Sequence, residues 1–161
     1  MKKELGKRKK LFKILSVIIV IILILVIIKS CNSKEKIKDA KEYQTYLKEN
    51  LKNIDQSLSE FEKWLLGIEI DENCSPEVIE GFKYYGEKLI KISQEYHKKE
   101  YIGKEEIPNY KEYLEYFKQV NKMGKEMVEL SKSKTPEDMK NQLDKIIETQ
   151  EKMKDQRKRI K

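Results

Sequence analysis

A seven-residue apolar repeat constrains the fold more than any other feature of this sequence. From Ile37 to Ile68 the apolar positions follow one another at alternating steps of three and four residues, with Gln44 as a polar interruption. Such spacing keeps one apolar stripe on a single helix face, which is typical of coiled coils and of long bundle helices. We therefore predict a long, coiled-coil-like helix that ends near Gly67.

Three more amphipathic segments follow this helix. Ser75-Pro76 and Thr135-Pro136 each combine a capping oxygen with a proline suited to the first helical turn. Pro108 suits the first turn of the helix between them, and Gly103 is the expected end of the helix that starts after Ser75. The apolar positions are Val78, Phe82, Tyr85, Leu89, Ile92 and Tyr96, then Tyr110, Tyr113, Leu114, Phe117, Val120, Met123, Met127 and Leu130, then Met139, Leu143, Ile146, Met153 and Ile160.

The fold class that these segments predict is all-α. The chain contains only 6 Gly and 3 Pro, too few for a sandwich or barrel with many turns. Short connections favour antiparallel neighbours, so we expect an up-down-up-down four-helix bundle. An even number of helices returns the C-terminus to the end at which the first helix begins.

The segment Ile14–Ile28 predicts a membrane anchor. Fourteen of its fifteen residues are Ile, Leu or Val, and Lys13 and Lys29 flank it. Each such side chain favours insertion by roughly 0.3–0.6 kcal/mol. On this interpretation an uncleaved signal-anchor helix spans the membrane. The domain organisation is then a basic cytoplasmic segment (1–13), the anchor (14–28), a juxtamembrane linker or stalk (29–46) and an extracytoplasmic helical bundle (47–161).

The tetrapeptide Ile28-Lys29-Ser30-Cys31 supports a second interpretation. It resembles the end of a bacterial lipoprotein signal, in which a small residue precedes the lipidated cysteine, although Lys29 stands where that pattern has a small or apolar residue. The chain would then be cut before Cys31 and anchored by lipid. Both interpretations place the protein at the cell membrane, single-pass or lipid-anchored, with membrane lipid as a partner and the C-terminal domain extracytoplasmic.

The distribution of charge argues against nucleic acid as a partner. Residues 1–31 hold eight of the 35 basic and one of the 28 acidic side chains, so the remainder holds 27 of each sign and has no net charge. Binding to a phosphate backbone depends on the number of phosphates that cationic side chains neutralise. We therefore expect no nucleic-acid binding.

Few residues are suited to catalysis or metal binding. The chain has one His and two Cys, and these do not form a zinc or di-iron motif. We predict no catalytic residue, no metal site and no cofactor, and we expect a binding or interaction module rather than an enzyme. Its partner would be another extracytoplasmic protein. The alternative is a self-associating coiled-coil stalk, in which the first helix pairs with its counterpart in a second copy.

Two groups of residues are candidates for contact. The C-terminal end is strongly basic, which suits anionic headgroups if it returns to the membrane. The opposite end is acidic, and seven of the nine tyrosines fall between Tyr84 and Tyr116. The candidate membrane-surface residues are Lys152, Lys154, Arg157, Lys158, Arg159 and Lys161, and the candidate interaction surface comprises Trp64, Glu69, Asp71, Glu72, Tyr84 and Tyr113.

Overall fold

The computed structural model describes residues 34–68 and 75–160. The predicted anchor Ile14–Ile28 and Cys31 lie outside these ranges. Within them, no helix combines the length and the apolar character that crossing a bilayer requires.

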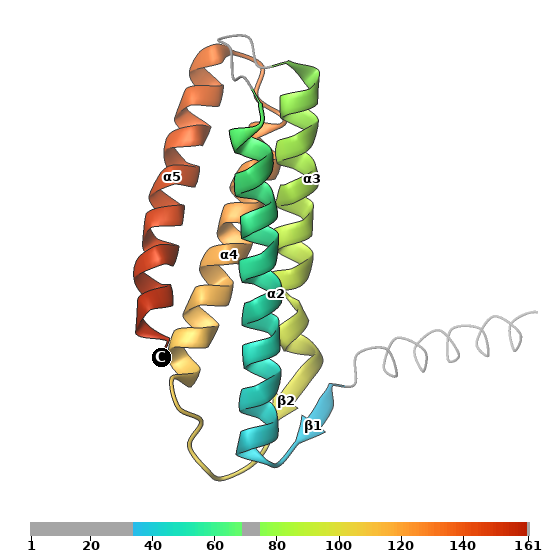
Figure 1. Ribbon diagram of the computed structural model, residues 1–161, viewed down its shortest axis with the longest axis vertical. Helices are drawn as coiled ribbons and strands as arrows, with labels where there is room; N and C mark the ends of the chain where they lie inside the picture. The colour runs from blue at the N-terminus through green and yellow to red at the C-terminus, as the bar shows by residue number, and fades with distance from the viewer. Residues whose placement is uncertain (1–33, 69–74, 161) are drawn as a thin grey trace, which may run out of the picture. The chain divides into compact units, whose positions relative to one another are not determined.

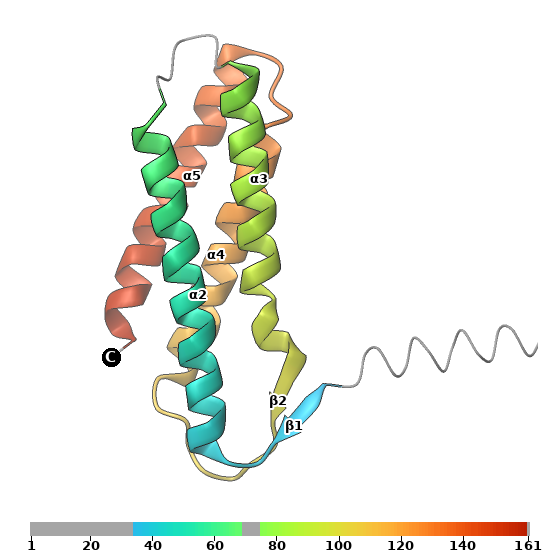
Figure 2. The same ribbon diagram turned by 45° about the vertical axis from the view of Figure 1, so that its right-hand side comes forward.

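Most of the described residues are helical, which confirms the all-α prediction. The four α-helices are α2 (Ala40–Leu66), α3 (Pro76–Ser93), α4 (Tyr110–Leu130) and α5 (Pro136–Arg159). Within the compact unit Lys36–Lys161, each helix runs antiparallel to the one before it (Figures 1 and 2). The start of α2 and the end of α5 consequently lie toward the same end of this unit.

Local capping determines where three of the helices begin. The Asp39 carboxylate accepts a hydrogen bond from the Glu42 amide at 2.7 Å, so α2 begins at Ala40. Ser75 and Thr135 accept in the same way from amides three residues later, and a proline occupies the first turn of α3 and of α5. Both prolines stand at the starts predicted from the sequence, because the cap and the first turn involve only neighbouring residues.

The predicted end of the second helix is wrong. The helix α3 ends at Ser93, ten residues before Gly103, and the 3-10 helix η1 (Glu95–Lys98) and the strand β2 (Lys99–Tyr101) follow it. The strand β2 pairs with β1 (Glu35–Ile37) in a two-stranded sheet. The pairing of β2 with β1 uses residues that a longer α3 would contain, so contact with the distant segment Glu35–Ile37 replaces the last turns of the predicted helix.

The start of α4 also differs from the prediction. Asn109 precedes the helix in the left-handed conformation, with a φ of 58°, and α4 begins at Tyr110. Pro108 therefore lies in the loop before the helix and not in its first turn. Asparagine adopts this conformation more readily than most residues, which allows the chain to turn sharply into α4.

The buried face of α2 is wider than the predicted stripe. Tyr43, Asn50 and Ser57 are buried beside the apolar stripe, whereas Leu58 and Leu65 on the stripe are only partly buried. The reason is that α2 contacts α3, α4 and η1 together. A helix that packs against several elements buries more than the two heptad positions of a coiled-coil seam.

The folded unit begins earlier than the domain boundary at residue 47. Ile37 and Tyr43 are buried in the core, and the compact unit starts at Lys36. Residues 36–46, which the sequence assigns to a linker or stalk, are therefore part of the fold. The polar character of Gln44 concealed this, because the neighbouring Tyr43 provides the buried ring.

Candidate functional site

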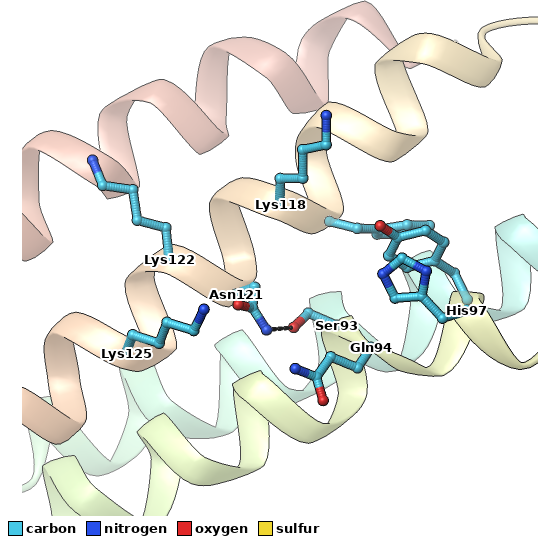
Figure 3. Close-up of a pocket in the computed structure, with 9 residues that line it drawn as sticks. Ser93, Gln94, His97, Lys118, Asn121, Lys122 and Lys125 are labelled. Carbon is cyan, nitrogen blue, oxygen red and sulfur yellow. Dashed lines mark hydrogen bonds between the residues drawn. The ribbon is translucent and has the colours of Figure 1, made fainter. Parts of the chain in front are cut away.

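A pocket of about 340 Å³ lies between α3, η1 and α4 (Figure 3). We call it the lysine pocket, because three lysines of α4 line it. These lysines follow one another at steps of four and three residues, so one face of the helix carries all of them. The lining residues are Ser93, Gln94, Tyr96, His97, Phe117, Lys118, Asn121, Lys122 and Lys125.

A hydrogen-bonded pair joins the two helices within the pocket. The Asn121 amide donates from Nδ2 to the Ser93 hydroxyl at 3.0 Å, and this hydroxyl donates to the Ile90 carbonyl at 2.9 Å. Ser93 is only 1% exposed. The pair uses one amide hydrogen of Asn121, and its amide oxygen and second hydrogen remain for a ligand.

Aromatic rings form the apolar part of the pocket. The Tyr96 ring lies 5.0 Å from Phe117 and 3.9 Å from His97, measured between ring centroids. Burial raises the pKa of Tyr96 above its ordinary value, so its hydroxyl stays neutral further into the alkaline range than that of an exposed tyrosine. These rings provide a surface for a flat apolar group.

The pocket is positively charged, because three lysines and no carboxylate line it. Lys118 and Lys122 form ion pairs along α4, with Glu115 at 3.8 Å and Glu126 at 3.6 Å. Figure 3 shows both side chains extending away from Ser93, whereas Lys125 extends toward Asn121 and Gln94. In the part of the chain that the structure describes, no carboxylate lies within 4.0 Å of the Lys125 ammonium. Lys125 is therefore the cation best placed to meet an anionic group.

The predicted basic cluster is partly neutralised by neighbouring side chains. Arg157 forms an ion pair with Asp55 of α2 at 3.0 Å, and Lys158 forms one with Asp155 at 3.1 Å. Lys152 pairs with Glu148 at 2.5 Å. Lys154 and Arg159 form no ion pair among residues 34–68 and 75–160, and Lys161 lies outside the described residues.

The predicted interaction surface does not form one patch among the residues that the structure describes. Tyr113 is only 1% exposed, because it faces the core of the bundle one turn before Phe117, so its inclusion in a surface was wrong. The Trp64 ring packs against Gly81, Phe82 and Tyr85 of α3. Tyr84 is 60% exposed. Glu69, Asp71 and Glu72 lie outside the described ranges.

Sequence reasoning did not find the lysine pocket. The spacing of Lys118, Lys122 and Lys125 on one helix face was the available signal. Because lysines on a solvated helix face are common, this spacing indicates a site only when another element provides the opposite wall. Asn121 and Ser93 meet through the packing of α4 on α3.

Among the described residues, no group of three or more His, Cys, Asp or Glu side chains is placed to hold a metal ion. Comparison of the chain with protein-family models, curated proteins and solved structures gives no match. The function is therefore inferred from the residues themselves.

Proposed function

We propose that this protein is a membrane-tethered, extracytoplasmic binding module without catalytic activity, and that the lysine pocket binds its ligand. The observation that carries this proposal is a pocket with three lysines and no lining carboxylate. The tether rests on Ile14–Ile28, whose composition favours insertion into a bilayer. The antiparallel helices, with the coiled-coil-like α2 first, would then stand on the outer face of the membrane.

The chemistry of the pocket suits a small acidic ligand. Lys125 and the free amide groups of Asn121 would bind a carboxylate or phosphate by charge-assisted hydrogen bonds. The rings of Tyr96 and Phe117 would contact a flat apolar part of the same ligand. Few convergent polar groups on an apolar surface are typical of ligand-binding pockets.

Ligand titration tests the pocket directly. Phenyl phosphate and benzoate serve as anionic probes and benzyl alcohol as the neutral one, with amide NMR shifts of the protein as the readout. We expect the anions alone to shift Ser93, Asn121 and Lys125. Lys125→Ala should weaken anion binding about tenfold, which corresponds to about 1.4 kcal/mol. Lys111→Ala, an exposed lysine of α4 outside the pocket, should leave the affinity unchanged.

The result that refutes this site is equal binding of the three probes, or anion binding that Lys125→Ala does not weaken. The tether is tested separately by the intact mass of protein extracted from membranes. A full-length chain indicates a signal anchor, whereas a chain that starts at lipid-modified Cys31 indicates a lipoprotein. Recovery of the full-length protein in a buffer wash without detergent would refute both forms of the tether.

A self-associating stalk is the second candidate function. The observation in its favour is the end of α2, where Leu66 is 88% exposed and Leu65 is only partly buried. Isolated exposed apolar residues are common on protein surfaces, so this observation is weaker than the pocket. A monomeric mass in light scattering of residues 34–161 would exclude the stalk.

A further inference from the structure

A second cleft lies between α2 and α3, and it uses a different face of α3 from the lysine pocket. Its volume is about 440 Å³. We call it the amide cleft, after the amide side chains of Asn50, Asn53 and Gln56 of α2, which line part of it. The lining residues are Tyr46, Glu49, Asn50, Asn53, Gln56, Ser57 and Glu60 of α2, Lys88, Lys91 and Ile92 of α3, and Glu95 of η1.

The buried residues of the cleft are polar where a bundle would normally have apolar ones. Tyr43, Asn50, Ser57 and Trp64 form one row of α2 at steps of seven residues. The two aromatic residues are at the ends of the row, and Asn50 and Ser57, which are 5% and 3% exposed, occupy the middle. Polar residues at core positions forfeit apolar burial, which is expected where they have a functional role.

Contacts on both sides give the cleft defined ends. At one end the Tyr46 hydroxyl donates a hydrogen bond to the Glu95 carbonyl. Beyond the other end the Trp64 ring packs so closely on α3 that a Cβ atom added at Gly81 would lie 1.9 Å from it. Because a hydrogen bond to η1 and an aromatic contact with α3 hold α2 in place on either side, the gap between them is part of the packing of α2.

The polar groups of the cleft include both donors and acceptors. The Asn50 amide donates to the Tyr46 carbonyl at 2.7 Å, and Gln56 donates to Glu60 at 3.1 Å. Glu60 also forms an ion pair with Lys88 across the two helices. The hydrogen bond from Lys88 lowers the pKa of Glu60, so this acceptor stays ionised at a lower pH than an ordinary glutamate.

We propose that the amide cleft binds an uncharged, hydroxyl-rich ligand, namely a saccharide. Its three carboxylates and two ammonium groups nearly balance, so the cleft favours neither anions nor cations. Amide, hydroxyl and carboxylate groups can both donate to and accept from sugar hydroxyls. Ile92 provides apolar surface for the C–H face of a sugar ring. This inference goes beyond the proposed function and does not depend on the lysine pocket.

The test is a titration of the full chain in detergent micelles, followed by amide NMR shifts. Maltotriose and tri-N-acetylchitotriose are the saccharide probes, and phenyl phosphate is the anionic comparison. At least one saccharide should produce saturable shifts at Asn50, Asn53, Ser57 and Lys88, and phenyl phosphate should not. If phenyl phosphate shifts only residues of the lysine pocket, that result supports the lysine pocket. The saccharide proposal is then judged only by the shifts that the saccharides cause in the amide cleft.

Two variants examine the cleft itself. Asn50→Leu should weaken saccharide binding at least tenfold while the midpoint of thermal unfolding stays the same or rises, since apolar volume then fills the seam. Asn53→Leu changes an exposed lining residue and should weaken binding in a chain whose core is unaltered. Asn141→Leu, an exposed asparagine of α5 outside the cleft, is the matched control and should bind like the wild type.

The proposal is overturned if neither saccharide gives saturable shifts in the cleft. That result would mean that the cleft is only a water-filled gap. The proposal is also overturned if binding persists unchanged in Asn50→Leu and Asn53→Leu. A third result also contradicts the proposal. If Asn50→Leu lowers the midpoint of thermal unfolding and Asn53→Leu still binds the saccharide, Asn50 has a structural role and the cleft is not the binding site.

Discussion

At the scale of single residues, the contact between Asp55 and Arg157 links the first and last helices of the described fold. The Arg157 guanidinium donates to both carboxylate oxygens of Asp55. The donor–acceptor distance is 3.0 Å from Nη2 to Oδ2, and from Nε it is 3.3 Å to Oδ2 and 3.4 Å to Oδ1. The Tyr116 hydroxyl donates to the same carboxylate at 3.3 Å. Arg157 was predicted to contact membrane lipid. The structure shows that this side chain holds α5 against α2.

Arg157→Gln should lower the free energy of unfolding by about 1 kcal/mol, measured by urea denaturation. The value is modest because both side chains are 40% exposed, although the bidentate geometry makes the pair stronger than an ordinary surface pair. Lys158→Gln removes a more exposed pair within α5, whose side chains are 76% and 70% exposed, and should change stability by less than about 0.5 kcal/mol. If the two substitutions lower the free energy of unfolding equally, the contact between α5 and α2 adds no more stability than an ion pair within one helix.

Tyr116 should make stability depend on pH in alkaline solution. Burial, followed by the charge of Asp55, raises the pKa of Tyr116 above its ordinary value. The folded chain therefore retains a proton that the unfolded chain releases above about pH 10. Unfolding then becomes easier as the pH rises past that value, by about 1.4 kcal/mol per unit for this residue. Urea denaturation from pH 9 to 11 should show a steeper loss in the wild type than in Tyr116→Phe, and parallel curves would contradict this.

At the scale of secondary-structure elements, α3 and α4 approach each other so closely at Gly86 and Gly124 that neither position has room for a side chain. A Cβ atom added at Gly86 would lie 2.7 Å from the Gly124 carbonyl oxygen, and one added at Gly124 would lie 2.7 Å from the Gly86 carbonyl oxygen. Backbone atoms cannot rotate out of the way as side chains do. The lack of a side chain at both positions therefore sets how closely α4 packs on α3, and the lysine pocket is formed by the same pair of helices.

Gly124→Ala should destabilise the fold by about 1–2 kcal/mol, even though alanine favours the helix by about 1 kcal/mol. The added methyl group forces the two backbones apart, and overpacking of this kind costs roughly 1–3 kcal/mol or more. Gly67→Ala is the control, since its nearest contact would be 3.5 Å away and its φ of −91° suits alanine. Thermal unfolding should show a lower midpoint for Gly124→Ala and little change for Gly67→Ala, and the opposite order would refute the packing argument.

At the scale of the whole molecule, the two pockets lie on different faces of α3. The lysine pocket uses Ser93 and Gln94 with α4, and the amide cleft uses Lys88 and Lys91 with α2. The last two turns of α3 therefore contribute residues to both, Ser93 to the lysine pocket and Lys88, Lys91 and Ile92 to the amide cleft. The packing of α3 against both neighbours keeps the two sites in fixed positions within the unit Lys36–Lys161.

Residues 34–161 should fold without the apolar N-terminal segment. The core of the four helices and the β1–β2 pair lies within this range. We expect circular dichroism to show a mainly helical protein that unfolds cooperatively on heating, as small single domains do. A weakly helical spectrum, or unfolding without a clear midpoint, would mean that the fold requires its N-terminal segment.

The sequence by itself determined the features that depend on neighbouring residues. The caps at Ser75 and Thr135 act within one turn and were predicted correctly. The apolar spacing of α4 predicted most of its buried face, but it missed Tyr116 and Gly124, which are buried, and included Leu114, which is only partly buried. Only the tertiary structure decided the end of α3 at Ser93, the pairing of β2 with β1 and the meeting of Asn121 with Ser93. Each of these joins segments that are distant along the chain, and their contacts depend on how closely the helices approach, which local spacing does not specify.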